Sequence, residues 1–146
     1  MNTLRIALVA LLATFALRAG ADPIHDAAKG NDVGKIKTLL NASPGAIKAT
    51  DPFGRSPLGV AAHNGGKEAA AALIAAGADL NFRDNFLQTP IFWALLNGHT
   101  DLVELLLEKK ADPNAKSRAG DTPLKLARKQ DNKRATELLI KHGAKE

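Results

Sequence analysis

The chain has 146 residues, which is enough for one compact domain, and it carries a formal net charge of +5 at pH 7. It contains no cysteine, which excludes a disulfide framework, a thiolate metal site and a lipid anchor on an N-terminal cysteine. Aromatic residues make up only 4% of the sequence and tyrosine is missing, so the stacking platforms that bind nucleic acid bases are not expected.

The first 21 residues have the layout of a secretory signal peptide. Residues 1–5 are a short polar start with one positive charge, and residues 6–17 are a weakly polar to apolar run of 12 residues. Ala19 and Ala21 then supply small side chains at the spacing that a signal peptidase reads. The run is short for a membrane span, which takes about 20 residues. We expect cleavage after Ala21 and a mature protein of residues 22–146 in the periplasm or secreted; the alternative is an uncleaved anchor or a buried N-terminal helix.

Residues 22–146 are predicted to be a row of repeated units. Pro57, Pro90 and Pro123 follow one another at an interval of 33 residues. Four further columns keep the same step: Leu58, Ile91 and Leu124; Ala61, Ala94 and Ala127; Leu73, Leu106 and Leu139; Ala78, Ala111 and Ala144. A period of about 33 residues is typical of stacked helical pairs, in which one unit alone cannot bury its apolar face. Such proteins usually offer a surface and do not run a reaction.

The first unit, at about residues 22–50, is an atypical copy. Ala27-Ala28 matches Ala61-Ala62 at an interval of 34, which places one extra residue in the loop 41–45. The first helix lacks the Ser/Thr-Pro start of the later units. Asp26 stands in a column that later holds apolar residues, namely Val60, Trp93 and Leu126. A polar residue in that column fits an outer cap with nothing stacked on it.

The units 51–83, 84–116 and 117–146 share one plan. Each opens with a turn-forming segment and continues with a hydroxyl residue and a proline, as in Ser56-Pro57. The hydroxyl group can cap the free N–H groups of a helix start, and proline suits the first helical position. A first helix is predicted from each proline to near Gly65, Gly98 and Asp131. A second helix is predicted over about 67–76, 100–109 and 133–142.

Two non-glycine residues occupy positions at which the other units have glycine. Leu87 stands where Gly54 and Gly120 occur in the turns, and Lys110 stands at a helix end where the neighbouring units have glycine. If the backbone is left-handed there, each side chain costs roughly 1 kcal/mol. We therefore expect a strained or differently shaped turn at Leu87.

The units resemble the ankyrin repeat, whose pattern is D-x-x-G-x-T-P-L-H-x-A-A-x-x-G, then a second helix and G-A-D-x-N. The second unit matches this pattern at Asp51, Gly54, Ser56, Pro57, Leu58, Ala61, Ala62, Gly65, Gly77, Ala78, Asp79 and Asn81. The resemblance covers residues 24–146 and implies an all-α solenoid of four helix-turn-helix repeats with β-turn fingers. The histidine of the pattern is replaced by Gly59, Phe92 and Lys125, so the hydrogen bond that it often makes is not expected. With its signal peptide, the array looks like the small periplasmic ankyrin-repeat proteins of Gram-negative bacteria.

In such stacks the fingers and the first helices line a concave face, which is where the resemblance places the binding surface. Phe53 and Phe86 fall at finger tips, and Leu87 and Leu96 add apolar surface nearby. Exposed apolar patches often mark interaction sites, and aromatics are enriched among hot spots. We predict that a protein partner is held by these four residues, surrounded by Arg55, His63, Gln88, Asn97, Arg118, Asp121 and Lys129. The alternative is that Phe53 and Phe86 pack on the neighbouring finger or on the core, which is where we expect Trp93.

The charge is unevenly distributed along the mature chain. Residues 22–108 hold 7 basic and 10 acidic residues, whereas residues 109–146 hold 11 basic and 5 acidic residues. Either the last repeat is a solvated end cap, or it attracts an anionic partner or membrane surface.

No catalytic or metal site can be assembled from the sequence. The four histidines, His25, His63, His99 and His142, lie in different units and do not have metal-ligand spacing. We expect no cofactor, no nucleic acid and no membrane-spanning segment after signal cleavage, and a monomer when unbound. The predicted function is that of an exported adaptor or scaffold for a periplasmic protein, supporting an envelope enzyme such as a catalase in stress defence. The alternative is an immunity protein that neutralises a toxin delivered to the periplasm; an enzyme is the third reading.

Overall fold

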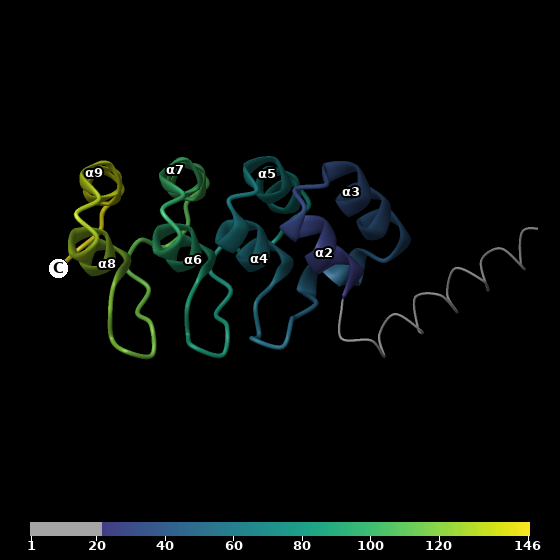
Figure 1. Ribbon diagram of the computed structural model, residues 1–146, viewed down its shortest axis with the longest axis horizontal. Coiled ribbons are helices and arrows are strands. Elements are labelled where there is room, and N and C mark those ends of the chain that lie inside the picture. The colour runs from purple at the N-terminus through teal and green to yellow at the C-terminus, as the bar shows by residue number, and fades with distance from the viewer. Residues whose placement is uncertain (1–21) are drawn as a thin grey trace, which may run out of the picture.

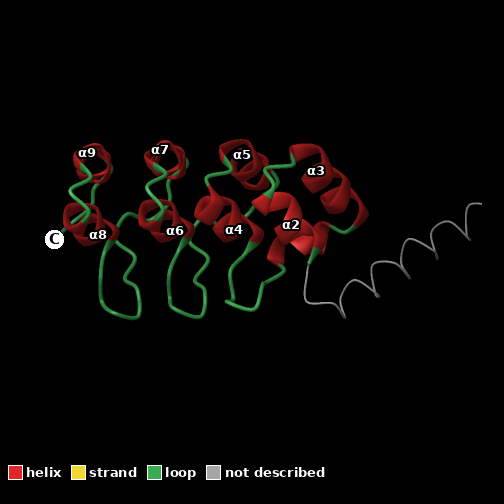
Figure 2. Ribbon diagram, viewed as in Figure 1, coloured by secondary structure: helices red, strands yellow, loops and turns green. Residues whose placement is uncertain are grey.

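The computed structural model describes residues 22–146, so the predicted signal peptide lies outside the described residues. Helices stand in two parallel rows, with loops projecting from one side as fingers (Figures 1 and 2). The first row holds α2 (Pro23–Lys29), α4 (Pro57–Asn64), α6 (Pro90–Leu96) and α8 (Pro123–Lys129). The second row holds α3 (Val33–Ala42), α5 (Lys67–Ala75), α7 (Thr100–Glu108) and α9 (Lys133–Lys141). The predicted solenoid of four helical pairs is confirmed, and no helix within residues 22–146 is long and apolar enough to cross a membrane.

The first helices begin at their prolines, as the sequence predicts. Ser56 Oγ accepts from the N–H of Gly59 at 3.1 Å, and Thr122 Oγ1 accepts from the N–H of Lys125 at 3.2 Å. Such caps satisfy donors that have no partner inside the helix. Thr89 is the exception, because its hydroxyl is buried without a hydrogen-bond partner and makes no cap.

The first unit is more regular than the sequence analysis predicted. Asp22 Oδ1 accepts from the N–H of Ile24 at 3.2 Å and Pro23 fills the first helical position, so Asp-Pro replaces Ser/Thr-Pro. His25 then occupies the place of the pattern histidine, and its Nε2 lies 3.0 Å from the carbonyl oxygen of Arg55 in the next unit. The sequence analysis missed this histidine, which ties the first unit to the second. A 3-10 helix, Pro44–Lys48, follows α3 where we expected a loop with one extra residue.

The core runs through all four units along the repeated columns. Leu73, Leu106 and Leu139 are fully buried in the second row, and the small residues of the first-row column let α4, α6 and α8 approach one another. Those small residues, Ala61, Ala94 and Ala127, are also fully buried. The stack is therefore one continuous core to which every unit contributes the same positions.

The fingers are held by aspartate side chains and by one another. Asp51 Oδ1 accepts from the N–H groups of Phe53 and Arg55 at 3.0 and 2.8 Å, an arrangement in which an aspartate replaces backbone partners in a turn. Between fingers, the N–H of Asn85 donates to the Phe53 carbonyl at 3.2 Å, and the N–H of Arg118 donates to the Phe86 carbonyl at 2.9 Å. Neighbouring finger tips are thus fixed in register.

The two glycine replacements have the predicted left-handed backbone. Leu87 has φ 58° and Lys110 has φ 74°, whereas Gly54 and Gly120 have φ 75° and 78° at the turn position of Leu87. The turn of the third unit keeps the shape of its neighbours, and the strain of a non-glycine residue falls on Leu87.

Candidate protein-binding surface

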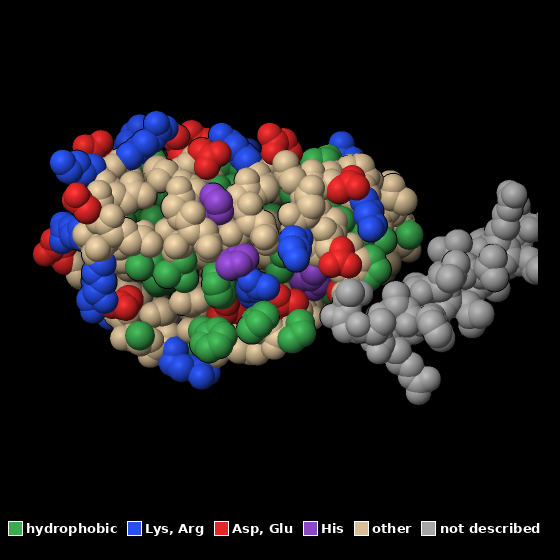
Figure 3. Space-filling model, viewed as in Figure 1, with side chains coloured by type: hydrophobic (Ala, Val, Ile, Leu, Met, Phe, Trp, Pro, Cys, Tyr) green, Lys and Arg blue, Asp and Glu red, His purple; other side chains and the backbone are tan. Residues whose placement is uncertain are grey.

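Two aromatic side chains project from neighbouring fingers. Phe53 is 54% exposed and Phe86 is 47% exposed, and the hydrogen bond from Asn85 to Phe53 holds the two fingers side by side. Apolar side chains gather along the finger side of the molecule in Figure 3. About half of the surface of each residue is therefore open to solvent.

Two leucines of the third unit are exposed as well. Leu87 follows Phe86 in the finger, Leu96 ends α6, and each is 40% exposed. We name Phe53, Phe86, Leu87 and Leu96 the apolar set. Large apolar side chains are seldom grouped on a protein surface without a function, because water disfavours them there.

Arg55 lies against the Phe53 ring and is largely buried. Its side chain is only 14% exposed, and its Nε is 2.7 Å from Asp51 Oδ2. The guanidinium carbon lies 5.0 Å from the ring centroid of Phe53 and 5.2 Å from that of Trp93, which is within the range of cation–π attraction. Arg55 therefore joins the finger of the second unit to the first helix of the third.

Trp93 is only partly core, in contrast to the prediction. Its Nε1 donates to Asp84 Oδ2 at 2.8 Å, while the indole packs against the core and keeps part of its surface exposed. His63 meets it edge-on, with ring centroids 5.1 Å apart. The indole turns outward because the buried Asp84 carboxylate gives its N–H a partner at the base of the finger.

A polar cluster connects α4 and α6 beside Trp93. Asn97 Nδ2 lies 3.1 Å from His63 Nδ1, and His99 Nε2 lies 3.2 Å from the His63 carbonyl oxygen. Burial lowers the pKa of His63 below 6.5, and the nearby charges of Arg55 and His99 lower it further, against the opposing effect of Asp51. At neutral pH this part of the first-helix row therefore offers an uncharged imidazole.

The remaining predicted residues divide between two places. Gln88 is half-buried, and its N–H donates to Asp84 Oδ1 at 2.9 Å. Arg118 is exposed on the last finger, next to Phe86. Asp121 and Lys129 pair with each other on the last unit, at 3.2 Å between Lys129 Nζ and Asp121 Oδ1. Hydrogen bonds from Lys125 and Lys129 lower the pKa of the Asp121 carboxyl.

Contacts across the second and third units therefore connect Phe53 and Phe86 with Arg55, His63, Gln88 and Asn97, and Leu87 and Leu96 are chain neighbours of this group. Arg118 borders this group, whereas Asp121 and Lys129 belong to a separate cluster. The sequence analysis missed Asp84 and Trp93 as parts of this surface; the signal available was a tryptophan in a column otherwise filled by aliphatic residues. Within residues 22–146, no group of three or more His, Asp or Glu side chains could hold a metal ion.

Comparison with protein families gives one match. The model for ankyrin repeats in three copies matches residues 24–117, and the described unit after it, 117–146, continues the same helical plan. No curated protein matches the chain at a significant level. The period, the two rows of helices with projecting fingers, and the family match agree: the chain belongs to the ankyrin-repeat family.

Proposed function

We propose that this protein is an exported binding module that holds a periplasmic protein partner with the apolar set. Ankyrin repeats generally mediate contacts between proteins and typically do not catalyse reactions, so a binding role is the family's usual one. Export is proposed from the pattern of residues 1–21. The partner class that we propose is an envelope protein, such as an enzyme of stress defence.

The observation that carries the proposal is the dipeptide Phe86-Leu87. Phe86 is 47% exposed, and Leu87 keeps a side chain at φ 58°, where glycine would remove the strain. Neither exposure nor strain stabilises the finger. A binding surface gains from the exposure, because an apolar side chain on a rigid turn loses little entropy when a partner covers it.

The supporting contacts make the surface rigid. Arg55 holds the Phe53 ring against the Trp93 side of the third unit, and Asp84 fixes the turn that carries Phe86. Side chains that are already ordered are the ones that bind tightly, since ordering them on binding is no longer required. Apolar groups in the centre with polar groups around them also follow the usual anatomy of interfaces.

The test uses the double variant Phe86→Ser with Leu87→Gly. Affinity purification from envelope extracts with the mature wild type as bait identifies the partner, and calorimetry with the purified partner then measures the affinity. The double variant should bind at least tenfold more weakly, because hot-spot side chains contribute about 2 kcal/mol or more each. Its thermal stability should equal or exceed that of the wild type.

The matched control is Ile140→Ser, which removes an apolar side chain of similar size and exposure, 52%, from the last unit. It should leave the affinity unchanged. Loss of stability with unchanged affinity in the double variant would assign Phe86 and Leu87 to the fold.

Export is tested separately, by fractionating cells and sequencing the N-terminus of the mature protein, which should begin at Asp22. Mature protein confined to the cytoplasm would contradict the proposed export.

A further inference from the structure

The last unit ends in a hollow of about 600 Å³ that the proposed binding surface does not use. It lies between the last finger and the outer side of α8, and it is lined by Lys116, Gly120, Thr122, Leu124, Lys125, Arg128, Lys129 and Glu146. We name this the end hollow. Basic side chains are numerous at this end of the molecule, opposite α2, and acidic side chains lie among them (Figure 3).

The end hollow lies where the last unit carries cations in place of packing residues. Phe92 and Leu95 are buried on α6, whereas Lys125 and Arg128 stand one interval later on α8 with side chains about half exposed, at 56% and 49%. The column of Phe92 points toward the following unit, as His25 shows by reaching the Arg55 carbonyl. The end hollow is therefore the space that a further unit would fill, and within residues 22–146 no helix fills it.

Carboxylates already occupy part of this space. The Arg128 guanidinium donates to the Glu146 carboxylate from the end of the chain, and Asp121 Oδ1 lies 2.7 Å from Lys125 Nζ and 3.2 Å from Lys129 Nζ. The hollow and its border thus hold four cations, including Lys116, against two carboxylates. Arg128 shows the pairing for which guanidinium groups are suited, since their planar N–H groups match a carboxylate.

We propose that the end hollow binds an acidic polypeptide segment, with the Glu146 side chain as its internal competitor. The excess of four cations over two carboxylates supplies the attraction, and the exposed methylene stems of Lys125 and Arg128 offer apolar surface to the methylene groups of glutamate side chains. Residues 22–108 carry an excess of acidic residues, so an acidic segment is repelled from the rest of the stack and directed to this end. A flat lipid surface would reach only the rim of a hollow, which favours a peptide.

The test measures the binding of a fluorescein-labelled oligoglutamate peptide to the mature protein by fluorescence anisotropy at low and at physiological salt. Arg128→Gln should weaken binding about fivefold, as expected when a charge-assisted hydrogen bond is lost at a partly exposed site. Glu146→Gln should strengthen binding about twofold, because it removes the competing carboxylate. Both side chains are exposed, so circular dichroism should show an unchanged fold.

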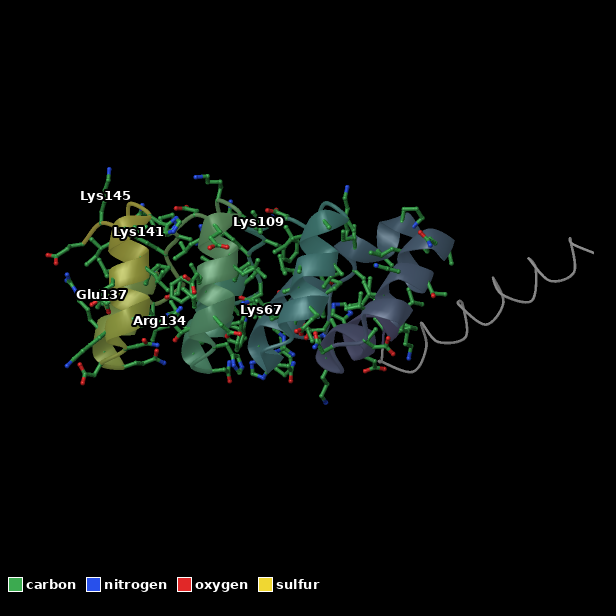
Figure 4. The ribbon with its side chains drawn as sticks, turned by 90° about the horizontal axis from the view of Figure 1, so that it is seen from above. Lys67, Lys109, Arg134, Glu137, Lys141 and Lys145 are labelled. Atoms are coloured by element: carbon green, nitrogen blue, oxygen red, sulfur yellow. The ribbon has the colours of Figure 1, made fainter. Side chains whose placement is uncertain are left out.

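Lys109→Gln is the matched control, since it changes the net charge equally and Figure 4 shows Lys109 at the end of α7, away from the end hollow. It should change the affinity less than twofold. An equal loss for Lys109→Gln and Arg128→Gln would overturn the proposal in favour of general charge attraction. So would binding to phosphatidylglycerol vesicles that depends on Arg128 in the absence of peptide binding. Weaker binding by Glu146→Gln would also overturn it, because Glu146 would then contribute to the site. None of these measurements involves the apolar set.

Discussion

The third and fourth units share one backbone plan but expose opposite kinds of surface. Phe92 and Leu95 of the third unit are buried, whereas Lys125 and Arg128 of the fourth unit are exposed and paired with carboxylates. The difference follows from stacking, because the third unit is covered on both sides and the fourth on one. Lysine and arginine at the covered positions would be desolvated without partners, and apolar residues at the uncovered ones would face water.

Their fingers differ in the same way, but stacking does not account for it. The third finger carries Phe86 and Leu87, and the fourth carries Ala119 and Gly120 at the corresponding positions. Both turns have the same left-handed residue, with φ 58° at Leu87 and 78° at Gly120. The backbone therefore takes this shape without the apolar side chains, which is why we propose that Phe86 and Leu87 serve a contact with a partner.

The largest expected effect tests the contrast in burial. Leu107 is 1% exposed, and Ile140, one interval later, is 52% exposed. Leu107→Ala should lower the free energy of unfolding by about 2–5 kcal/mol, because it leaves a cavity in the core. Ile140→Ala should lower it by less than about 1 kcal/mol. Urea unfolding, followed by the fluorescence of the single tryptophan, checks both. Equal losses of unfolding free energy in the two variants would show that this face of α9 is covered in solution.

A smaller loss of stability is expected from the hydrogen bonds that hold the third finger but not the fourth. The buried Asp84 carboxylate accepts from the N–H groups of Phe86 and Gln88 at 2.8 and 2.9 Å and from Trp93 Nε1 at 2.8 Å. Ser117, its counterpart, accepts one bond with its hydroxyl, from the N–H of Asp121 at 3.3 Å. Asp84→Ala should therefore lower the free energy of unfolding by about 2–3 kcal/mol, and Ser117→Ala by about 1 kcal/mol or less.

The Asp84 variant also has a local readout. Removal of the carboxylate takes away the acceptor of the Trp93 indole N–H, so the emission spectrum of the folded protein should shift while that of Ser117→Ala stays unchanged. If Asp84→Ala unfolds at the urea concentration of the wild type, the aspartate does not hold the finger.

The next expected effect is a gain in stability at the turn of the third finger. Leu87→Gly should raise the free energy of unfolding by about 0.5–1 kcal/mol, because glycine adopts positive φ without a steric penalty. Gly120→Leu is the reverse experiment, and a Cβ at Gly120 would meet no atom within 4 Å, so only the backbone penalty applies. It should lower the free energy of unfolding by a similar amount. Opposite shifts in thermal midpoint are expected, and a loss of stability in Leu87→Gly would mean that the leucine side chain packs favourably on its finger.

Most of the fold could be predicted because the same demands recur in every unit. The prolines mark the helix starts, Leu73 and its equivalents mark the core, and the glycine positions reveal left-handed turns, including Leu87. Helix caps and turn glycines follow from neighbouring residues, and the core positions follow from the 33-residue period. Both kinds of signal can be read from a single sequence. The start of the first unit departs from the Ser/Thr-Pro pattern of the later units, because Asp22 replaces the hydroxyl residue and caps the helix equally well.

The candidate surface could be predicted only in outline. The exposed aromatics follow from the positions of Phe53 and Phe86 in the repeat, but the support beneath them does not. Arg55 contacts Phe53 in its own unit and Trp93 in the next, and both aromatics occur at these positions in only some units. The repeat period predicts only the positions that the units share. Contacts between residues that differ from unit to unit become visible only in the three-dimensional structure.

The smallest expected effect lies on the first-helix row, where the second unit has a histidine and the fourth has a lysine. His63 is partly buried beside Arg55. Burial is the main cause that lowers its pKa from 6.5, and the charges of Arg55 and His99 lower it further. The folded state therefore takes up a proton less readily than the unfolded chain. Stability from this residue is complete above about pH 6.5 and declines as the pH falls below that value.

The decline should be small, because part of the imidazole surface remains in water, which screens its charge interactions. Urea midpoints measured from about pH 7.5 to about pH 5.5 should fall less steeply in His63→Gln than in the wild type. Lys129→Gln, at the corresponding position of the fourth unit, should keep the wild-type slope, because it leaves His63 in place. A wild-type slope in His63→Gln would assign the pH dependence to other groups. It would also mean that the contact of His63 with Trp93 does not distinguish the two protonation states.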